Sequence, residues 1–137
     1  MVNKFNQLAE EAAVYHSRLK KSVSDGLIIY NENTLNVMRR ILDKHPDGCF
    51  DMIFADPPYF LSNDGFSCQN GQMVSVNKGE WDKSKGMAAD LEFYEEWLRL
   101  CYALRKPNGT IWVCGTYHNI YMVGYRMQLI GYQILNY

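Results

Sequence analysis

The sequence predicts an α/β fold in which a parallel sheet carries helices on both faces. Apolar runs with strand character alternate four times with segments whose apolar residues recur at helical spacing. The short connections between them favour right-handed crossovers between parallel strands. We therefore expect about four strands with flanking helices, in a single domain over residues 1–137.

The first part of the chain contains a helical pattern, a strand pattern and the start of a second helix. Apolar side chains at steps of three and four predict an amphipathic helix over 4–21, which Ser24-Asp25-Gly26 ends. A short buried strand is predicted at 27–30, and Asn33 or Thr34 caps the next helix. The apolar face of that helix consists of Leu35, Met38, Ile41 and Leu42.

A second buried strand is predicted over 49–55, after the turn His45-Pro46-Asp47-Gly48. The strand closes on Asp56. Residues 60–89 then show no sustained periodicity and are rich in Asn, Gly, Ser and Lys. Loops of this length are usually functional or disordered, so we expect a long loop next to the site.

A strong helix is predicted to begin at Asp90 as its N-cap, with Arg105-Lys106 suited to the negative end of its dipole. Its apolar face consists of Phe93, Trp97, Leu100, Cys101 and Leu104. The remaining predicted elements are a turn at 106–109, a buried strand at 110–114, a helix at 117–129 and a strand at 132–136.

Composition indicates a cytoplasmic globular protein. No stretch approaches the ~20 apolar residues that span a bilayer, and Met1-Val2-Asn3-Lys4-Phe5 lacks the basic-then-apolar plan of a secretion signal. The formal net charge of −1 argues against strong nucleic-acid affinity by this chain alone. We expect no membrane partner.

The four cysteines are far apart and form no C-x-x-C pair. Cys49, Cys101 and Cys114 lie inside apolar segments, where a reduced, buried side chain is expected. The three histidines show no metal-ligand spacing with them, so no metal site is predicted.

The most informative feature is Asp56-Pro57-Pro58-Tyr59, directly after the strand over 49–55. In open α/β sheets, ligands bind at the carboxyl ends of the strands. A carboxylate, two prolines and an aromatic ring form a compact polar group there on a rigid backbone. The structural alternative is a rigid turn with Asp56 as a cap.

The tetrapeptide resembles the catalytic motif of the S-adenosylmethionine-dependent amino methyltransferases, which methylate adenine N6 or cytosine N4 in DNA. Residues 50–61 look like the β-class DNA adenine methyltransferases of bacterial restriction–modification systems. Gly79-Glu80-Trp81-Asp82 resembles the family's Trp-Asp element. Residues 104–111 resemble its helix-to-strand turn, with Asn108 where glycine is usual. The resemblance covers about residues 26–136 and implies a partial Rossmann-like methyltransferase fold.

The resemblance also implies roles for the motif. Asp56 and the main-chain carbonyl of Pro57 would accept hydrogen bonds from the target amino group and localise its lone pair, so that catalysis is positioning plus electrostatics. Pro57 and Pro58 would hold the backbone rigid. Tyr59 would stack on a base that has been flipped out of the helix.

Further contacts follow from the same resemblance. S-adenosylmethionine is the implied cofactor, bound by Asp56 and, at the end of the first strand, by Asn31 and Glu32, where the family usually has Gly-Asp. An exposed carboxylate at the start of a helix is the alternative for Glu32. The residues implied to contact DNA are Phe60, Lys78, Trp81, Lys83 and Lys85.

The family's chain continues into a target-recognition segment and a Phe-x-Gly-x-Gly turn that cradles the cofactor. No two glycines here are separated by a single residue. We therefore expect the catalytic part of a DNA adenine methyltransferase that is inactive alone. Alternatives are a non-catalytic remnant, or one half of a split enzyme completed by a second chain or by a homodimer. Methylation of cytosine N4 or of RNA is a further alternative, since the motif chemistry is shared.

Overall fold

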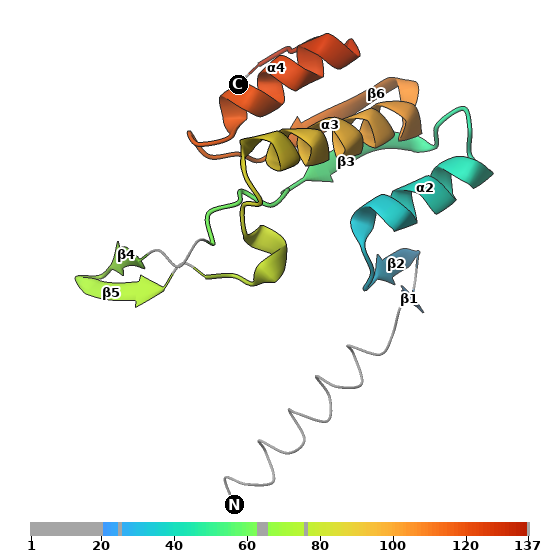
Figure 1. Cartoon of the computed structure of the whole chain (residues 1–137). Coiled ribbons are helices and arrows are strands. Elements are labelled where there is room, and N and C mark those ends of the chain that lie inside the picture. The colour runs from blue at the N-terminus through green and yellow to red at the C-terminus, as the bar shows by residue number, and fades with distance from the viewer. Residues whose placement is uncertain (1–20, 25, 63–65, 76, 137) are drawn as a thin grey trace, which may run out of the picture. The chain divides into compact units, whose positions relative to one another are not determined.

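The computed structural model describes residues 21–24, 26–62, 66–75 and 77–136 (Figure 1). Its chain divides into two compact units between Arg40 and Ile41. The first unit contains two short strands, β1 (Lys21–Ser24) and β2 (Leu27–Tyr30), and the start of helix α2 (Thr34–Lys44). The second unit contains the other elements.

Strands β1 and β2 form an antiparallel hairpin, with Lys21 opposite Tyr30 and Ser24 opposite Leu27. Gly26 in the two-residue turn has φ +82°, which suits glycine. The strand predicted at 27–30 is therefore present, but its parallel pairing and its burial were wrong: Leu27 is 59% exposed. The helix predicted over 4–21 lies outside the described residues apart from Lys21, which begins β1.

Helix α2 begins as the sequence predicts. The side chain of Asn33 caps it, because Asn33 Oδ1 accepts a hydrogen bond of 3.3 Å from the main-chain N–H of Asn36. The predicted apolar positions are half-buried, and Val37 is the buried residue of this helix.

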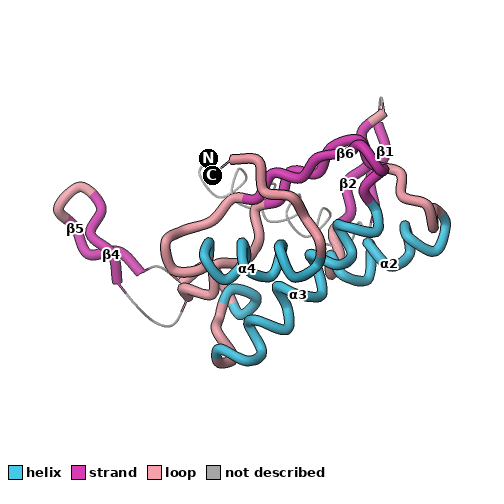
Figure 2. Tube along the Cα trace, turned by 90° about the horizontal axis from the view of Figure 1, so that it is seen from above, coloured by secondary structure: helices cyan, strands magenta, loops and turns pink. Residues whose placement is uncertain are grey.

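The second unit is built on a parallel pair of strands, β3 (Phe50–Ala55) and β6 (Arg105–Val113). Helix α3 (Met87–Leu104) packs against β6 and against helix α4 (Ile120–Ile130), which lies beside it (Figure 2). Side chains of α3 and α4 form most of the core: Tyr94, Trp97, Leu98, Cys101, Leu104 and Val123. The described residues are thus an α/β structure with a small parallel sheet and helices.

The β3–β6 pair has two unlike faces because side chains alternate along a strand. Ile53 lies opposite Ile111 on the half-buried face. On the other face Phe54 lies opposite Trp112, and these side chains are 68% and 51% exposed. No residue of either strand is fully buried, so the prediction that both strands are buried was wrong: one face is half-buried and the other is exposed.

The turn predicted at 106–109 lies inside β6, as a register irregularity. Phe50 pairs with Arg105, but Met52 already pairs with Thr110. The guanidinium of Arg105 donates to the carbonyls of Lys106, Pro107 and Gly109 at 2.9–3.2 Å and holds the extra residues in place. Gly109 is required there, since an added Cβ would lie 2.8 Å from the Phe50 carbonyl oxygen.

The segment 60–89 contains structure that its composition did not predict. It includes the hairpin of β4 (Phe66–Gln69) and β5 (Gln72–Ser75), the short 3₁₀ helix η1 (Glu80–Asp82) and the first turn of α3. Gly86 is the N-cap of α3, so the prediction of Asp90 as N-cap was wrong. Asp90 instead accepts hydrogen bonds from Ser84 Oγ and Lys85 N, at 2.6 and 3.2 Å. These bonds stabilise the residues that precede the helix.

The strand predicted at 132–136 is also absent, since these residues have no regular secondary structure. Gly131 ends α4 in the left-handed conformation, and the chain turns back toward α3. There the Tyr132 hydroxyl donates to the carbonyl of Leu98 at 2.8 Å. The Tyr132 ring meets the Tyr102 ring edge-on, with centroids 4.9 Å apart.

Candidate active site

The residues Asp56 to Tyr59 leave the carboxyl end of β3 in an extended, irregular segment. The neighbouring strand ends at the same level, because Ala55 pairs with Val113 and its carbonyl accepts a hydrogen bond of 2.8 Å from Cys114 N. The motif thus lies at the carboxyl edge of the parallel pair, where the sequence placed it.

Asp56 and Tyr59 contact each other directly. The Tyr59 hydroxyl donates to Asp56 Oδ1 at 2.5 Å. This hydrogen bond, followed by desolvation and the charge of Asp56, raises the pKa of Tyr59 to about 12. Asp56 is exposed and Tyr59 is half-buried. The phenol therefore orients a carboxylate that still faces solvent, a role beyond the stacking that the resemblance implies.

Pro58 is held by a series of hydrogen bonds through buried polar side chains. The Tyr94 hydroxyl of α3 donates to the Pro58 carbonyl at 3.2 Å and accepts from Asn119 Nδ2 at 3.3 Å. Asn119 Oδ1 in turn accepts from Thr116 N at 2.8 Å, at the start of α4. Tyr94 and Asn119 are each 1% exposed. Burial raises the pKa of Tyr94, and the bond from Asn119 partly opposes this.

The last residue of the motif and the residues that follow it are held by Asp82, at the end of η1. Its Oδ1 accepts from the main-chain N–H groups of Tyr59 and Phe60 at 2.9 and 3.0 Å, and its Oδ2 accepts from Ser62 Oγ at 2.6 Å. Ser62 N also donates to the Asp82 carbonyl at 3.2 Å. The exposed fractions of Asp82 and Ser62 are 1% and 0%.

Phe60 packs inward. Its ring lies 5.5 Å from that of Phe93 and 5.4 Å from that of Tyr94, as centroid distances. Its φ of +56° is uncommon for a residue with a side chain, and the Asp82 bond to its N–H supports that conformation. The aromatic cluster fixes the backbone on which Tyr59 stands.

Of the lysines predicted to contact DNA, the structure brings Lys78 to the motif. Its Nζ lies 5.2 Å from the centroid of the Tyr59 ring, a cation–π distance. Lys83 forms an ion pair of 2.7 Å with Glu80, and Lys85 is exposed. Trp81 lies on η1 and is 62% exposed.

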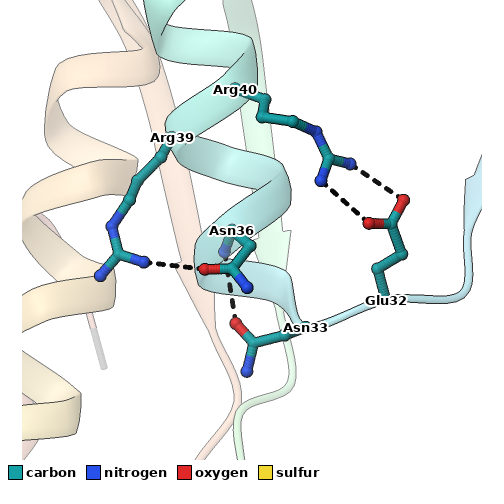
Figure 3. A network of polar contacts seen from close by, with 5 residues as sticks. All are labelled: Glu32, Asn33, Asn36, Arg39 and Arg40. Carbon is teal, nitrogen blue, oxygen red and sulfur yellow. Dashed lines mark hydrogen bonds and ion pairs between the residues drawn. The ribbon is translucent and has the colours of Figure 1, made fainter.

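Asn31 and Glu32 lie in the first unit, so the structure does not place them beside the motif. Both carboxylate oxygens of Glu32 accept from the guanidinium of Arg40 at 2.9 Å, while Arg39 donates to Asn36 at 3.0 Å (Figure 3). A bidentate pair of this kind fixes the direction of the Glu32 carboxylate at the end of β2.

Several residues of the site escaped the sequence analysis. Asp82 was part of the Trp-Asp resemblance but received no role, and Tyr94 continues the helical spacing of Trp97 and Cys101, which would have marked it as a core residue. Asn119 carries no sequence signal, because its importance depends on α4 packing beside α3.

The described residues contain no group of three His, Cys, Asp or Glu that could hold a metal ion. Among the cysteines, Cys101 is buried and its pKa is raised to about 12 by desolvation. Cys49 and Cys114 are only half-buried, which corrects the prediction that they are buried. No helix in the described ranges is both long and apolar enough to cross a membrane.

Comparison with known proteins places this arrangement among the DNA methylases. The family model described as DNA methylase matches residues 50–137. The type II methyltransferase M2.DpnII of Streptococcus pneumoniae is 47% identical over 111 residues, covering 78% of this chain and 41% of that protein. M2.LlaDCHI of Lactococcus lactis subsp. cremoris is 52% identical over 97 residues, covering 71% and 36%. M2.MboI of Moraxella bovis is 47% identical over 108 residues, covering 79% and 38%.

The chain thus spans 36–41% of the length of these curated relatives. The matched family region runs from the first residue of β3 through the motif and both packed helices. The chain belongs to the DNA methylase family.

Proposed function

We propose that this chain carries the amino-group site of a site-specific DNA methyltransferase that transfers a methyl group from S-adenosylmethionine to adenine N6. The observation that carries the proposal is the Asp56–Tyr59 pair at the carboxyl edge of β3. Tyr94 and Asp82 hold the backbone of that segment on both sides. The type II methyltransferases that match this chain support it.

The adenine amino nitrogen is a poor nucleophile because its lone pair is delocalised into the ring. Asp56 is exposed and already directed by Tyr59, so it can accept one N–H of that group. The Pro57 carbonyl is the proposed second acceptor. Two acceptors would draw the lone pair toward the methyl donor, so the site acts by positioning and electrostatics.

The Tyr59 ring is the proposed stacking surface for the flipped base. Lys78 lies over this ring in the structure. We propose that its ammonium group binds a DNA phosphate and moves off the ring when a base stacks there. We propose Phe60, Trp81, Lys83 and Lys85 as further residues on the DNA side, with Phe60 acting through the backbone that its half-buried ring holds.

S-adenosylmethionine would supply an electrophilic methyl group when bound. Asp56, Asn31 and Glu32 are its proposed contacts. Glu32 fits this task, because its bidentate pair with Arg40 fixes the direction of its carboxylate. The parallel β3–β6 pair with α3 on one face fits a partial Rossmann-like domain over residues 1–137, with 60–89 as the DNA-facing segment.

The proposed enzyme works on cellular DNA and therefore in the cytoplasm. Because the chain spans less than half of its relatives, we propose that it is inactive alone. A second candidate is a non-catalytic interaction half, which pairs with a second chain or another copy. The exposed apolar side chains Met52, Phe54 and Trp112 on β3 and β6 favour it.

Calorimetry with S-adenosylmethionine tests the proposal, with Asp56→Ala as the matched variant. We expect binding that the substitution weakens. Methyl transfer by a complete enzyme that contains this segment, to duplexes that contain adenine but no cytosine or the reverse, then distinguishes N6 from N4 chemistry, with an RNA of the same sequence as a third substrate. An affinity equal in both proteins would refute the assigned site.

A further inference from the structure

Asp82 is a buried carboxylate that accepts side-chain hydrogen bonds from the last residue of the motif and from the two residues Phe60 and Ser62 after it. Its donors are the N–H groups of Tyr59 and Phe60 and the hydroxyl of Ser62, at 2.6–3.0 Å. A carboxylate that is 1% exposed is costly unless it is well hydrogen-bonded. Since these partners precede it by 20 to 23 residues, the bonds join two separate parts of the chain.

The position of Asp82 is itself set by η1. Asp82 N donates to the Gly79 carbonyl at 3.1 Å and closes the 3₁₀ turn. Gly79 has φ +136°, and a Cβ there would lie 2.9 Å from Trp81 Nε1. The turn thus holds Asp82 inward while Trp81 stays exposed.

The same network returns to the Tyr59 ring. Ser62 Oγ donates to Asp82 and accepts from Lys78 N at 2.8 Å. Lys78 then places its ammonium over the Tyr59 ring, while the Tyr59 hydroxyl reaches Asp56. Asp82 therefore supports Tyr59 at its main chain directly and at its ring face through Ser62 and Lys78.

We propose that Asp82 is a positioning residue for amino methylation: it holds the main chain of Tyr59 and Phe60 so that the Tyr59 hydroxyl directs Asp56 and the Tyr59 ring faces the substrate. This inference rests on the proposed function and adds a residue to it. Asp82 contacts no reacting atom. It acts through Tyr59.

Nuclear magnetic resonance on the 137-residue chain tests this, because its readouts require no methyl transfer. The first readout is amide hydrogen exchange at Tyr59 and Phe60. The second readout is the titration of the Tyr59 phenol, observed on carbon-labelled tyrosine between pH 9 and pH 11. The variants are Asp82→Ala and Asp82→Asn. The control is Asp90→Ala, which removes a carboxylate that likewise accepts from a serine hydroxyl and a main-chain N–H.

In Asp82→Ala we expect exchange at Tyr59 and Phe60 to rise about tenfold, the effect of losing one hydrogen bond. The tyrosinate fraction of Tyr59 at pH 10.5 should also rise, by up to about 25-fold, as its pKa falls from about 12 toward 10 when the phenol leaves Asp56. Asp82→Asn keeps an oxygen for the two amides but loses the charge, so smaller changes in the same direction are expected. Asp90→Ala should leave both readouts as in the parent chain.

The inference would be overturned if amide exchange and the phenol titration in Asp82→Asn match those of the parent chain. The same result is required of Asp82→Ala where that variant folds. Equal changes in Asp90→Ala would also overturn it, because they would reflect general destabilisation. Failure of the proposed function has a different signature: both readouts change as expected, but S-adenosylmethionine does not bind.

Discussion

Removal of the Tyr94 hydroxyl should destabilise the protein and loosen the motif, although no atom of the motif is changed. Tyr94→Phe keeps the ring and its contacts with Phe60 and Phe93, so it leaves no cavity. It removes the donor to the Pro58 carbonyl and the acceptor of Asn119 Nδ2. The whole effect therefore comes from polar groups that lose a partner.

The magnitude follows from the burial of those groups. A buried polar group left without a partner costs about 1–3 kcal/mol. Asn119 is 1% exposed and bears this cost in full, whereas Pro58 is half-buried and its carbonyl can regain water. We therefore expect a loss of about 1–3 kcal/mol in the free energy of unfolding, with the larger share from Asn119.

Urea unfolding followed by circular dichroism measures this, with an unchanged m-value showing that the folded state stays compact. Tyr102→Phe is the matched control, since Tyr102 is on the same helix, is 37% exposed and makes its contacts with Tyr132 through the ring. A double-mutant cycle with Asn119→Ala should give a coupling energy of about 0.5–1.5 kcal/mol. If the free energies of unfolding of Tyr94→Phe and Tyr102→Phe differ by less than about 0.5 kcal/mol, the hydrogen bonds that join α4 to Pro58 through Tyr94 do not stabilise the motif.

Four further outcomes are expected. Asp56→Ala should weaken S-adenosylmethionine binding in calorimetry with little change in the urea midpoint, because the side chain is exposed; an unchanged affinity would contradict its role. In a complete enzyme that contains this segment, Tyr59→Ala should lower methyl transfer to adenine more than Tyr59→Phe does, since only the first loses the stacking surface, and equal losses would count against stacking. Leu98→Ala, at a side chain that is 0% exposed, should cost about 2–5 kcal/mol in urea unfolding, and a cost below about 1 kcal/mol would place Leu98 outside the core. The hydrogen bond from Arg99 lowers the pKa of Glu95, so its stabilising effect is present above its ordinary pKa of 4.5 and is lost as pH falls through the folded value. Unfolding midpoints of Glu95→Gln between pH 3 and pH 7 should show a weaker acid dependence than the parent chain, and parallel curves would exclude Glu95 as a source.

Much of the second unit was predictable from local pattern. Strand β3 ends at the residue before Asp56, and α3 buries Trp97, Cys101 and Leu104 as their spacing indicated. The Asn33 cap of α2 was equally readable, because capping needs only a side-chain oxygen and the N–H three residues later. These features depend on neighbours in sequence.

The errors arose where pairing or burial depends on distant residues. The sequence pattern of an apolar run such as 27–30 is the same whether the strand pairs with its neighbour in a hairpin or lies inside a parallel sheet. Residues 132–136 have strand character, but the bond from Tyr132 to Leu98 draws the chain toward α3 instead. Composition likewise hid the β4–β5 hairpin in a segment that lacked periodicity.

The sequence by itself determined where the motif lies: an acidic residue, two prolines and a tyrosine directly after a strand, in a chain that belongs to the DNA methylase family. Only the tertiary structure decided how that tetrapeptide is held. Asp82 and Asn119 reach it across 23 or more residues of chain, directly and through Tyr94. A carboxylate or an amide acquires such a role only when folding removes it from water and brings its partners within hydrogen-bonding distance, and no local pattern records that distance.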